Sequence, residues 1–304
     1  MYNIENVLDI ARKNGFEIKE NESMSKHTTF KIGGNAQVLI KVTNNEGLID
    51  ILRKCNESEI PVFILGKGSN LLVSDNGIDG IVIKLDGVFS QIKQIDEETV
   101  CCGAGVSLAK LCSYACEHGL SGLEFAWGIP GSVGGAVYMN AGAYGGEMKD
   151  VIESCTHIDT NNTAGTLNAE KMDLSYRHSV YAENNYIITS VTVKLKKDSS
   201  VEIRNRMNDY MNRRKEKQPV EFPSAGSVFK RPEGYFAGAL IQEANLKGKQ
   251  IGGAQVSEKH SGFIINKGNA TCNDVLELVK YIQERVKENS GIELECEIKP
   301  IGKM

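Results

Sequence analysis

Residues 119–146 read GLSGLEFAWGIPGSVGGAVYMNAGAYGG, a stretch with nine glycines and one charged residue, Glu124. Glycine lacks the Cβ that keeps other groups away from the backbone, and it accepts positive φ. The stretch therefore predicts a backbone that something else approaches closely, and we expect a flat, partly anionic ligand. Its centre, Ile129 to Gly135, is expected to turn from loop into helix and to present free backbone N–H groups to a phosphate or an electron-rich ring.

A transmembrane helix is the competing interpretation of this stretch. Residues 125–146 carry no charge over 22 residues, about the length that crosses a bilayer. Seven glycines and the residues Pro130, Ser132 and Asn140 make them a poor helix for a hydrocarbon environment. We therefore expect a buried loop and helix that hold a ligand, and no membrane span.

With 41% hydrophobic and 24% charged residues, the composition is that of a water-soluble chain. Its 304 residues are enough for two domains. A net charge of −4 and a pI near 5.9 argue against a nucleic-acid-binding protein. The N-terminus lacks a basic region followed by an apolar segment, so we expect no signal peptide and a cytoplasmic location. The eight cysteines form no C-x-x-C pair, which indicates free, mostly buried thiols rather than a zinc site or disulfides.

The first 85 residues predict a small α/β unit, because helical patterns alternate with short apolar runs. Helices are expected at the N-terminus, ending near Gly15, and over 46–55. The run 62–65 predicts a strand, and strands over 71–73 and 81–83 are expected to continue the same sheet.

A glycine-rich loop, GKGSN at 66–70, follows the first of these strands. Successive N–H groups of such a turn can bind an anion, so the loop is a second candidate phosphate site. It matches neither the P-loop nor the Rossmann fingerprint, because Leu71 stands where the latter requires glycine. A tight turn between two strands remains the alternative.

A second unit is predicted over 86–200. It should contain a strand over 99–102, a helix capped by Ser107 and ended by Gly119, and antiparallel strands over 151–159 and 186–195. Between the last two lies Arg177, which on composition alone is better explained as a solvated surface residue than as a functional one.

The third predicted unit, 201–304, begins with a charged helix over 201–218 that Pro219 stops, and a second helix opens at Thr271 with an [ST]-x-x-[DE] start. A final strand is expected over 293–298, with three glutamates on one face and apolar residues on the other. From 201 to 231 the chain holds eight Lys and Arg against four Asp and Glu. A solvated helix face explains most of this excess, but Lys217, Lys230 and Arg231 flank the loop 223–229 and could hold phosphates there.

Six blocks, spread over nearly the whole chain, are specific in combination. They read PVFILGKGSNLLVSD, GLEFAWGIPGSVGGAVYMNAGAYGG, SYRHS, PSAGSVFKRPEGYFAGALIQEANLKG, QIGGAQVSEKHSGFIIN and GIELECEIKPIG. Together they resemble the UDP-N-acetylenolpyruvoylglucosamine reductase family, also called UDP-N-acetylmuramate dehydrogenases. The chain is similar to the shorter type, because the segment between Arg177 and the strand at 186 has no room for a tyrosine-bearing substrate flap.

The resemblance implies an α+β fold: a vanillyl-alcohol-oxidase-type (PCMH-type) FAD-binding domain of two α+β subdomains, over 1–85 and 86–200, and a C-terminal α+β substrate-binding domain over 201–304. It implies non-covalent FAD, NADPH as co-substrate and UDP-N-acetylglucosamine enolpyruvate as substrate, in peptidoglycan precursor synthesis, without an obligatory protein partner. The residues it assigns to FAD are Gly66, Lys67, Gly68, Ser69, Asn70, Ile129, Pro130, Gly131, Ser132, Gly134 and Gly135.

The same resemblance implies the catalytic residues Arg177, Ser227 and Glu297. A guanidinium can stabilise the substrate carboxylate, a protonated carboxyl can assist it, and the serine hydroxyl can protonate the carbon next to the one that receives hydride. Lys217 and Arg231 are implied for the UDP diphosphate and His260 for the rim of that site. Cys296 stands where proline or arginine is expected, which leaves Glu295 as an alternative to Glu297.

Two other functions remain open on the sequence: an FAD oxidase of the same fold that acts on a sugar or alcohol with oxygen, and a nucleotide-sugar-binding protein without turnover.

Overall fold

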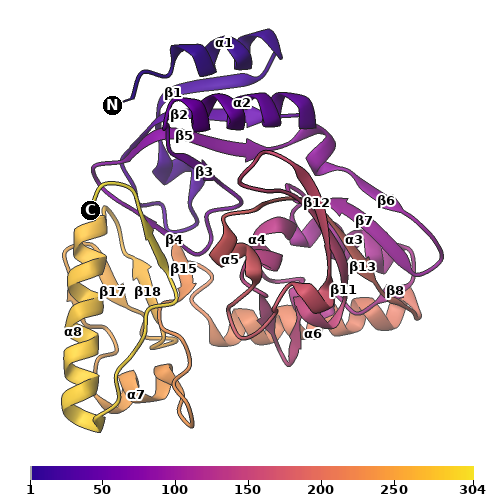
Figure 1. Cartoon of the computed structure of the whole chain (residues 1–304). Helices are drawn as coiled ribbons and strands as arrows, with labels where there is room; N and C mark the ends of the chain where they lie inside the picture. Colours follow the sequence, from indigo (N-terminus) through magenta and orange to yellow (C-terminus); the bar gives the residue numbers. More distant parts are fainter. Residues whose placement is uncertain (1) are drawn as a thin grey trace. The chain divides into compact units, whose positions relative to one another are not determined.

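Helices and short strands alternate along the computed structural model, which describes residues 2–304 (Figure 1). The described chain divides into two units. The first comprises residues 2–20, 38–67 and 80–213, and the second comprises 21–37, 68–79 and 214–304. The three-part division expected at 86 and 201 stays a prediction.

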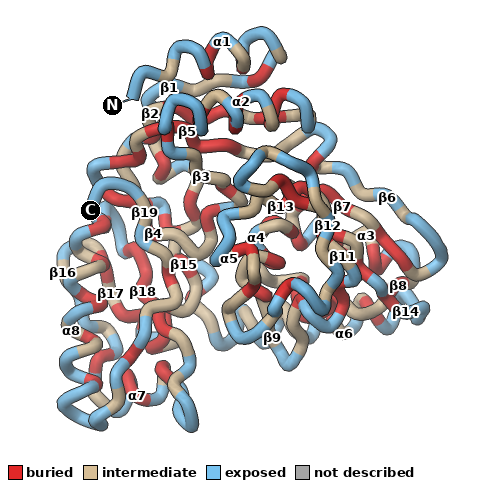
Figure 2. The backbone as a smooth tube through the Cα atoms, in the orientation of Figure 1, coloured by how far each residue is buried: buried red, intermediate tan, exposed pale blue. Residues whose placement is uncertain are grey.

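A four-stranded sheet with the order β1-β2-β5-β3 begins the first unit, and helices α1 and α2 lie side by side against it (Figure 1). The bounds are α1 Glu5–Lys13, β1 Glu17–Ser23, β2 Asn35–Val42, α2 Asn45–Glu57, β3 Val62–Ile64 and β5 Ile78–Leu85. Buried and exposed residues alternate around α2 (Figure 2), and Asn44 caps it by accepting a hydrogen bond from the Gly47 N–H at 2.8 Å. Both helices predicted here are confirmed.

A five-stranded antiparallel sheet with the order β12-β11-β13-β7-β6 follows. Its strands are β6 Ile92–Gln94, β7 Thr99–Gly103, β11 Ile152–Ile158, β12 Ala164–Asn168 and β13 Ile187–Lys194. The strands predicted over 99–102, 151–159 and 186–195 are confirmed, and the last two pair antiparallel as expected.

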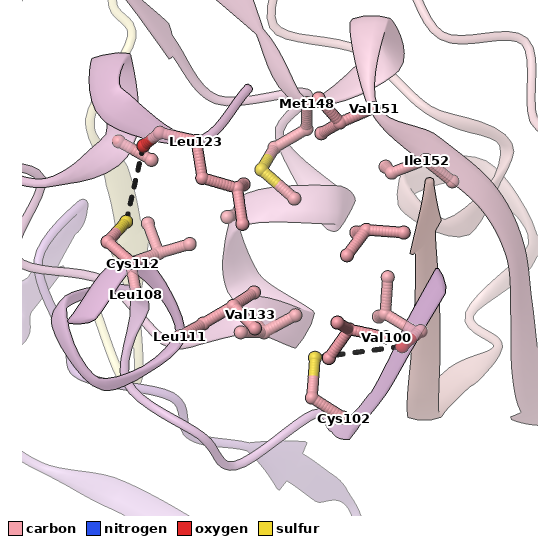
Figure 3. Packing of buried hydrophobic residues seen from close by; sticks show 14 of the residues in the cluster. Val100, Cys102, Leu108, Leu111, Cys112, Leu123, Val133, Met148, Val151 and Ile152 are labelled. Carbon is pink, nitrogen blue, oxygen red and sulfur yellow. Dashed lines mark hydrogen bonds between the residues drawn. The ribbon is translucent and has the colours of Figure 1, made fainter. Parts of the chain in front are cut away.

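Four helices pack with this sheet: α3 Leu108–Glu117, α4 Val133–Tyr138, α5 Val180–Asn184 and α6 Ser200–Lys217, of which α6 continues into the second unit. Ser107 caps α3 as predicted, and Gly119, with φ +65°, follows its end. Figure 3 shows Leu108 and Leu111 of α3 meeting Val133 of α4 in the buried core.

The remaining elements of the first unit are short. They are the pairs β8 Leu120–Ser121 with β14 Lys196–Lys197 and β9 Gly142–Ala143 with β10 Gly146–Glu147, and the 3₁₀ turns Gly87–Ser90, Glu124–Ala126, Met148–Asp150 and Ala169–Lys171. A further 3₁₀ turn, Met24–His27, lies in the second unit.

The second unit is built on a four-stranded antiparallel sheet with the order β15-β18-β17-β16. Its elements are β15 Ser224–Ser227, α7 Ala237–Glu243, β16 Gln250–Ile251, β17 Ala254–Val256, β18 Phe263–Asn266 and α8 Cys272–Ser290. Thr271 and Asp274 form the predicted capping box at the start of α8. The Asp75 carboxylate also accepts hydrogen bonds from the Cys272 and Asn273 N–H groups, at 2.8 and 3.1 Å, so the segment 68–79 is tied to this helix.

Two strand predictions are wrong. Residues 71–73 form β4, but β4 pairs in parallel with β19, Lys299–Ile301, rather than with the sheet of β3. Residues 293–298 form no strand: their backbone meets residues 228–230 only through the Phe229–Cys296 bridge and its flanking hydrogen bonds, which is too short for a ladder. Leu294 and Ile298 are nevertheless buried, as the predicted apolar face requires, although no strand pairing forms here.

The one α-helix in the uncharged stretch 125–146 is the six-residue α4, and within residues 2–304 no helix is long and apolar enough to cross a bilayer. All eight cysteines are free and buried or half-buried, as predicted.

Candidate active site

Helix α4 begins inside the glycine-rich stretch, as predicted, and Ser132 caps it by accepting a hydrogen bond from the Gly135 N–H at 3.3 Å. Not all of the backbone N–H groups that were expected to be free are free. The N–H groups of Val133 and Gly134 donate to the carbonyls of Val106 and Ala104, at 2.8 and 2.9 Å. The start of α4 is therefore bonded to the chain that leads from β7 to α3, and that part of the prediction is wrong because these donors are satisfied within the protein.

Other atoms do approach the glycines of this region closely, as predicted, but many of these atoms belong to the protein itself rather than to a ligand. A Cβ on Gly134 would lie 2.8 Å from the Cβ of Ala104, and a Cβ on Gly66 would lie 2.5 Å from the Ser132 Oγ. Gly135 differs, because it is exposed and the one neighbour of its Cβ would be the Ser132 Oγ at 3.2 Å. The approach of Gly66 to Ser132 brings the start of the GKGSN loop to the cap of α4 within the first unit.

The rest of the GKGSN loop, from Gly68, belongs to the second unit. Gly68 has φ +63°, its Cβ position is occupied by the His27 carbonyl, and its own carbonyl accepts a hydrogen bond from the Thr29 N–H at 3.2 Å. Asn70 donates from Nδ2 to the Glu297 carbonyl at 3.1 Å and accepts from the Lys299 N–H at 2.9 Å. The end of this loop is thus fixed against the segment that carries Glu297.

Ser227 and Glu297 are neighbours across two chain segments of the second unit. Ser227 ends β15, pairs with Phe263 of β18, and follows Gly226, whose φ of +79° only glycine adopts readily. The Glu297 N–H donates to the carbonyl of Val228, the residue after Ser227, at 2.7 Å. Two of the three predicted catalytic residues are therefore brought together by the fold.

The alternative carboxyl, Glu295, lies in different surroundings. Its side chain is 71% exposed and forms an ion pair with Lys230. Lys230, one of the three cations expected to hold phosphates, is therefore engaged in this ion pair. Glu297, by contrast, is half-buried, and its backbone N–H is hydrogen-bonded to the Val228 carbonyl. Because the Glu295 side chain is exposed and engaged by Lys230, the geometry favours Glu297 for the catalytic role.

Arg177 lies in the first unit, in a turn that runs from Ser175 to His178 and is closed by two backbone hydrogen bonds of 3.2 and 3.3 Å. Its φ is +56°, and its guanidinium lies 5.0 Å from the centre of the Tyr176 ring, which is itself exposed. The guanidinium is held on an exposed turn of unusual backbone conformation, which is a common feature of functional residues.

Three predicted substrate-binding residues lie in the second unit. Lys217 is the exposed last residue of α6, and the Arg231 guanidinium lies 4.5 Å from the centre of the exposed Phe236 ring. His260 packs edge-on against Phe263, the partner of Ser227 in the sheet, with 4.9 Å between ring centres. Its Nδ1 accepts from the Gly262 N–H at 3.2 Å, and burial lowers its pKa, so the ring is neutral with its proton on Nε2.

Two family models match the chain. Residues 36–167 match an FAD binding domain, and residues 218–301 match the C-terminal domain of UDP-N-acetylenolpyruvoylglucosamine reductase. Among the relatives, the UDP-N-acetylenolpyruvoylglucosamine reductase of Caldanaerobacter subterraneus is 50% identical over 93% of each chain, and that of Clostridium botulinum is 51% identical over 97% of this chain and 95% of its own. The chain belongs to the UDP-N-acetylenolpyruvoylglucosamine reductase family. The crystal structure of this reductase from Thermus caldophilus agrees, with a TM-score of 0.80 and 39% identity over 94% of this chain and 98% of that one.

Membership in the reductase family confirms the resemblance, the α+β fold class and FAD as the cofactor. The first unit fits a flavin at the start of α4, because Pro130 and Gly135 are exposed there and Gly135 has no side chain, so a flat ring system can approach its backbone. The individual FAD and substrate residues stay predictions.

Part of the basic excess over 201–231 is neutralised within the protein: Arg206 pairs with Glu124 and Asp198, and Arg213 pairs with Asp209. Sequence reasoning missed Asn140, which it treated only as a polar residue that disfavours a membrane span. Its place directly after an apolar helical run was the one available signal, because asparagine is favoured there.

Proposed function

We propose that this chain reduces the enolpyruvyl double bond of UDP-N-acetylglucosamine enolpyruvate with electrons from NADPH, by way of non-covalent FAD, to give UDP-N-acetylmuramate for peptidoglycan synthesis in the cytoplasm. The observation that carries the proposal is that the Glu297 N–H donates a 2.7 Å hydrogen bond to the carbonyl of Val228, the residue after Ser227, in a member of this reductase family. This contact between the segments that carry Ser227 and Glu297 supports the proposal, because the reaction requires a proton donor and a carboxyl in one region.

The flavin, when bound, takes hydride from NADPH and supplies it to the CH₂ carbon of the enolpyruvyl group. We propose that residues 1–85 and 86–200 bind it as two subdomains, with Gly66, Lys67, Gly68, Ser69, Asn70 and the loop 129–135 contributing, and that residues 201–304 bind the sugar nucleotide.

The protein residues are proposed to stabilise the negative charge that develops on the substrate and to deliver the proton. Hydride addition places negative charge on the adjacent carbon and on its carboxylate, and the Arg177 guanidinium can bind that carboxylate through two parallel hydrogen bonds. Glu297, when protonated, donates a further hydrogen bond to it. The Ser227 hydroxyl then gives its proton to the adjacent carbon, so one hydride and one proton convert the double bond to the saturated product.

Three residues are proposed to bind the nucleotide part. Lys217 and Arg231 are long cationic side chains suited to a diphosphate, and the stacking of Arg231 on Phe236 holds the guanidinium plane in a defined orientation. His260, neutral and with Nε2 as a donor, suits the rim of the same site.

Anaerobic titration of the purified protein tests the function. We expect yellow protein whose absorbance at ~450 nm is lost with NADPH and restored by the enolpyruvyl sugar nucleotide. Bleaching by a simple sugar with recovery in air would instead indicate the oxidase, and protein that binds the nucleotide sugar but no FAD would indicate a binding protein without turnover.

A further inference from the structure

Arg177 occupies a backbone conformation that its residue type disfavours. It is the third residue of the turn from Ser175 to His178, and its φ is +56°, where turns usually place glycine or asparagine. The surroundings must hold such a residue in place, because the conformation costs free energy in an L-residue with a Cβ. The question is which groups hold this turn.

Asn140 is the first of these groups. It is completely buried, and its side-chain amide makes three hydrogen bonds of 2.9 Å. Its Nδ2 donates to the Ser175 carbonyl and to the Glu147 carboxylate, and its Oδ1 accepts from the Lys149 N–H. A buried amide with donors and acceptor all engaged has one orientation, so the Ser175 carbonyl at the start of the turn is fixed.

The end of the turn is held from the same place. Ser179, also completely buried, donates from Oγ to the carbonyl of Tyr138, the last residue of α4, at 2.8 Å. Asn140 follows the end of α4 with φ +41°, a conformation that asparagine tolerates better than most residues. Both flanks of the Arg177 turn are therefore attached to the C-terminal end of the helix that begins at the candidate flavin loop.

We propose that Asn140 is a positioning residue for Arg177: its amide sets the place and direction of the turn from which the guanidinium reaches the substrate carboxylate. This inference rests on the proposed function, because it assumes that Arg177 binds that carboxylate. Asn140 itself is buried beneath the turn and is assigned no contact with substrate.

The variant Asn140→Gly tests this, since glycine keeps the left-handed backbone and removes only the amide. Asn185→Gly is the matched control, because Asn185 has φ +54° at the end of α5 and its side chain is exposed. We expect Asn140→Gly to retain FAD and a normal rate of flavin reduction by NADPH, and to slow flavin reoxidation by the sugar nucleotide about 10- to 100-fold, the cost of misplacing a binding group by about an ångström. Asn185→Gly should leave both rates unchanged.

A double-mutant cycle separates positioning from general damage. If Asn140 acts through Arg177, adding Asn140→Gly to Arg177→Ala should slow reoxidation no further than Arg177→Ala alone. The proposal would be overturned if the double variant were slower than Arg177→Ala by the full factor that Asn140→Gly causes alone. It would also be overturned if Asn140→Gly slowed both half-reactions equally or left the reoxidation rate unchanged. If Asn140→Gly does not fold, Ser179→Ala carries the same cycle, because it removes the second attachment of the turn. Wild-type protein that NADPH bleaches but the sugar nucleotide does not reoxidise contradicts the proposed function instead.

Discussion

The candidate site uses glycine for different reasons in the two units. In the first unit, Gly66 and Gly134 have no side chain because Ser132 and Ala104 fill the space, and Gly135 alone leaves open backbone. In the second unit, Gly226 has nothing within 4 Å of its Cβ position, and its φ of +79° is what requires glycine. The glycines of the first unit are therefore tightly packed against other residues except at the exposed Gly135. In the second unit, Gly226 forms the turn that leads into Ser227. The effects of substitution should differ accordingly.

After the loss expected for Ser227 itself, the largest effect is expected at Glu297, also in the second unit. Glu297→Gln should lower kcat by about 100-fold, because an amide cannot replace the protonated carboxyl in stabilising developing charge as well. Glu295→Gln, in the exposed ion pair with Lys230, should change it little. Steady-state kinetics of both variants decides, and a greater loss in Glu295→Gln would transfer the role to Glu295.

A smaller effect, on stability rather than on rate, is expected at Gly134 in the first unit. Gly134→Ala would place a Cβ 2.8 Å from the Ala104 Cβ and 3.2 Å from its carbonyl oxygen, so we expect the free energy of unfolding to fall by about 1–3 kcal/mol. Urea unfolding of the FAD-free protein measures it.

Gly135→Ala is the matched control and should give the opposite sign. Its Cβ would meet only the Ser132 Oγ at 3.2 Å, and alanine is favoured over glycine in a helix by about 0.5–1 kcal/mol. The FAD-free protein should be as stable or slightly more stable, while the affinity for FAD falls. Unchanged FAD affinity in Gly135→Ala would remove this residue from the flavin site.

Next in size is the diphosphate contact proposed for Arg231. Arg231→Ala should raise KM for the sugar nucleotide about tenfold, the worth of one such contact, and lower kcat less, because a group far from the reacting carbons binds ground state and transition state alike. Lys249→Ala, whose cation lies over Tyr281, is the control for loss of a surface cation that stacks on a ring. A normal KM in Arg231→Ala would return Arg231 to the solvated surface.

The smallest effect concerns pH. Burial lowers the pKa of His260 and of His157, so both are neutral in the fold, whereas the unfolded chain binds a proton below about pH 6.5. Stability should therefore fall as the pH drops from about 6.5 toward the lowered values. In His260→Asn, whose Oδ1 can replace Nδ1 as acceptor for Gly262, the loss between about pH 7.5 and 5.5 should be smaller. An equal loss in variant and wild type would contradict the assignment.

Local signals predicted the fold well where the structure is local. Ser107, Gly119, Thr271 and Pro219 marked helix ends correctly, because caps and breakers act within a few residues. The strand predicted over 293–298 and the sheet assigned to 71–73 failed, because a strand exists only with a partner, and the partner of β4 lies more than 200 residues away.

The candidate site shows the same limit. Motifs singled out Ser227 and Glu297, and the structure makes them neighbours. The donors at Val133 and Gly134 were expected to be free because their acceptors, the carbonyls at 104 and 106, leave no signal in the sequence. Asn140 was overlooked for a related reason, since its role depends on Ser175, 35 residues away.

Stopped-flow absorbance of the flavin in Ser227→Ala tests most directly whether this residue protonates the product. Reduction by NADPH needs no proton donor to the substrate, so its rate should stay near that of wild type, while reoxidation by the enolpyruvyl sugar nucleotide should slow by about 10²- to 10⁴-fold. That loss equals about 3–5 kcal/mol of transition-state stabilisation. Equal slowing of both half-reactions, or a normal reoxidation rate, would contradict the account.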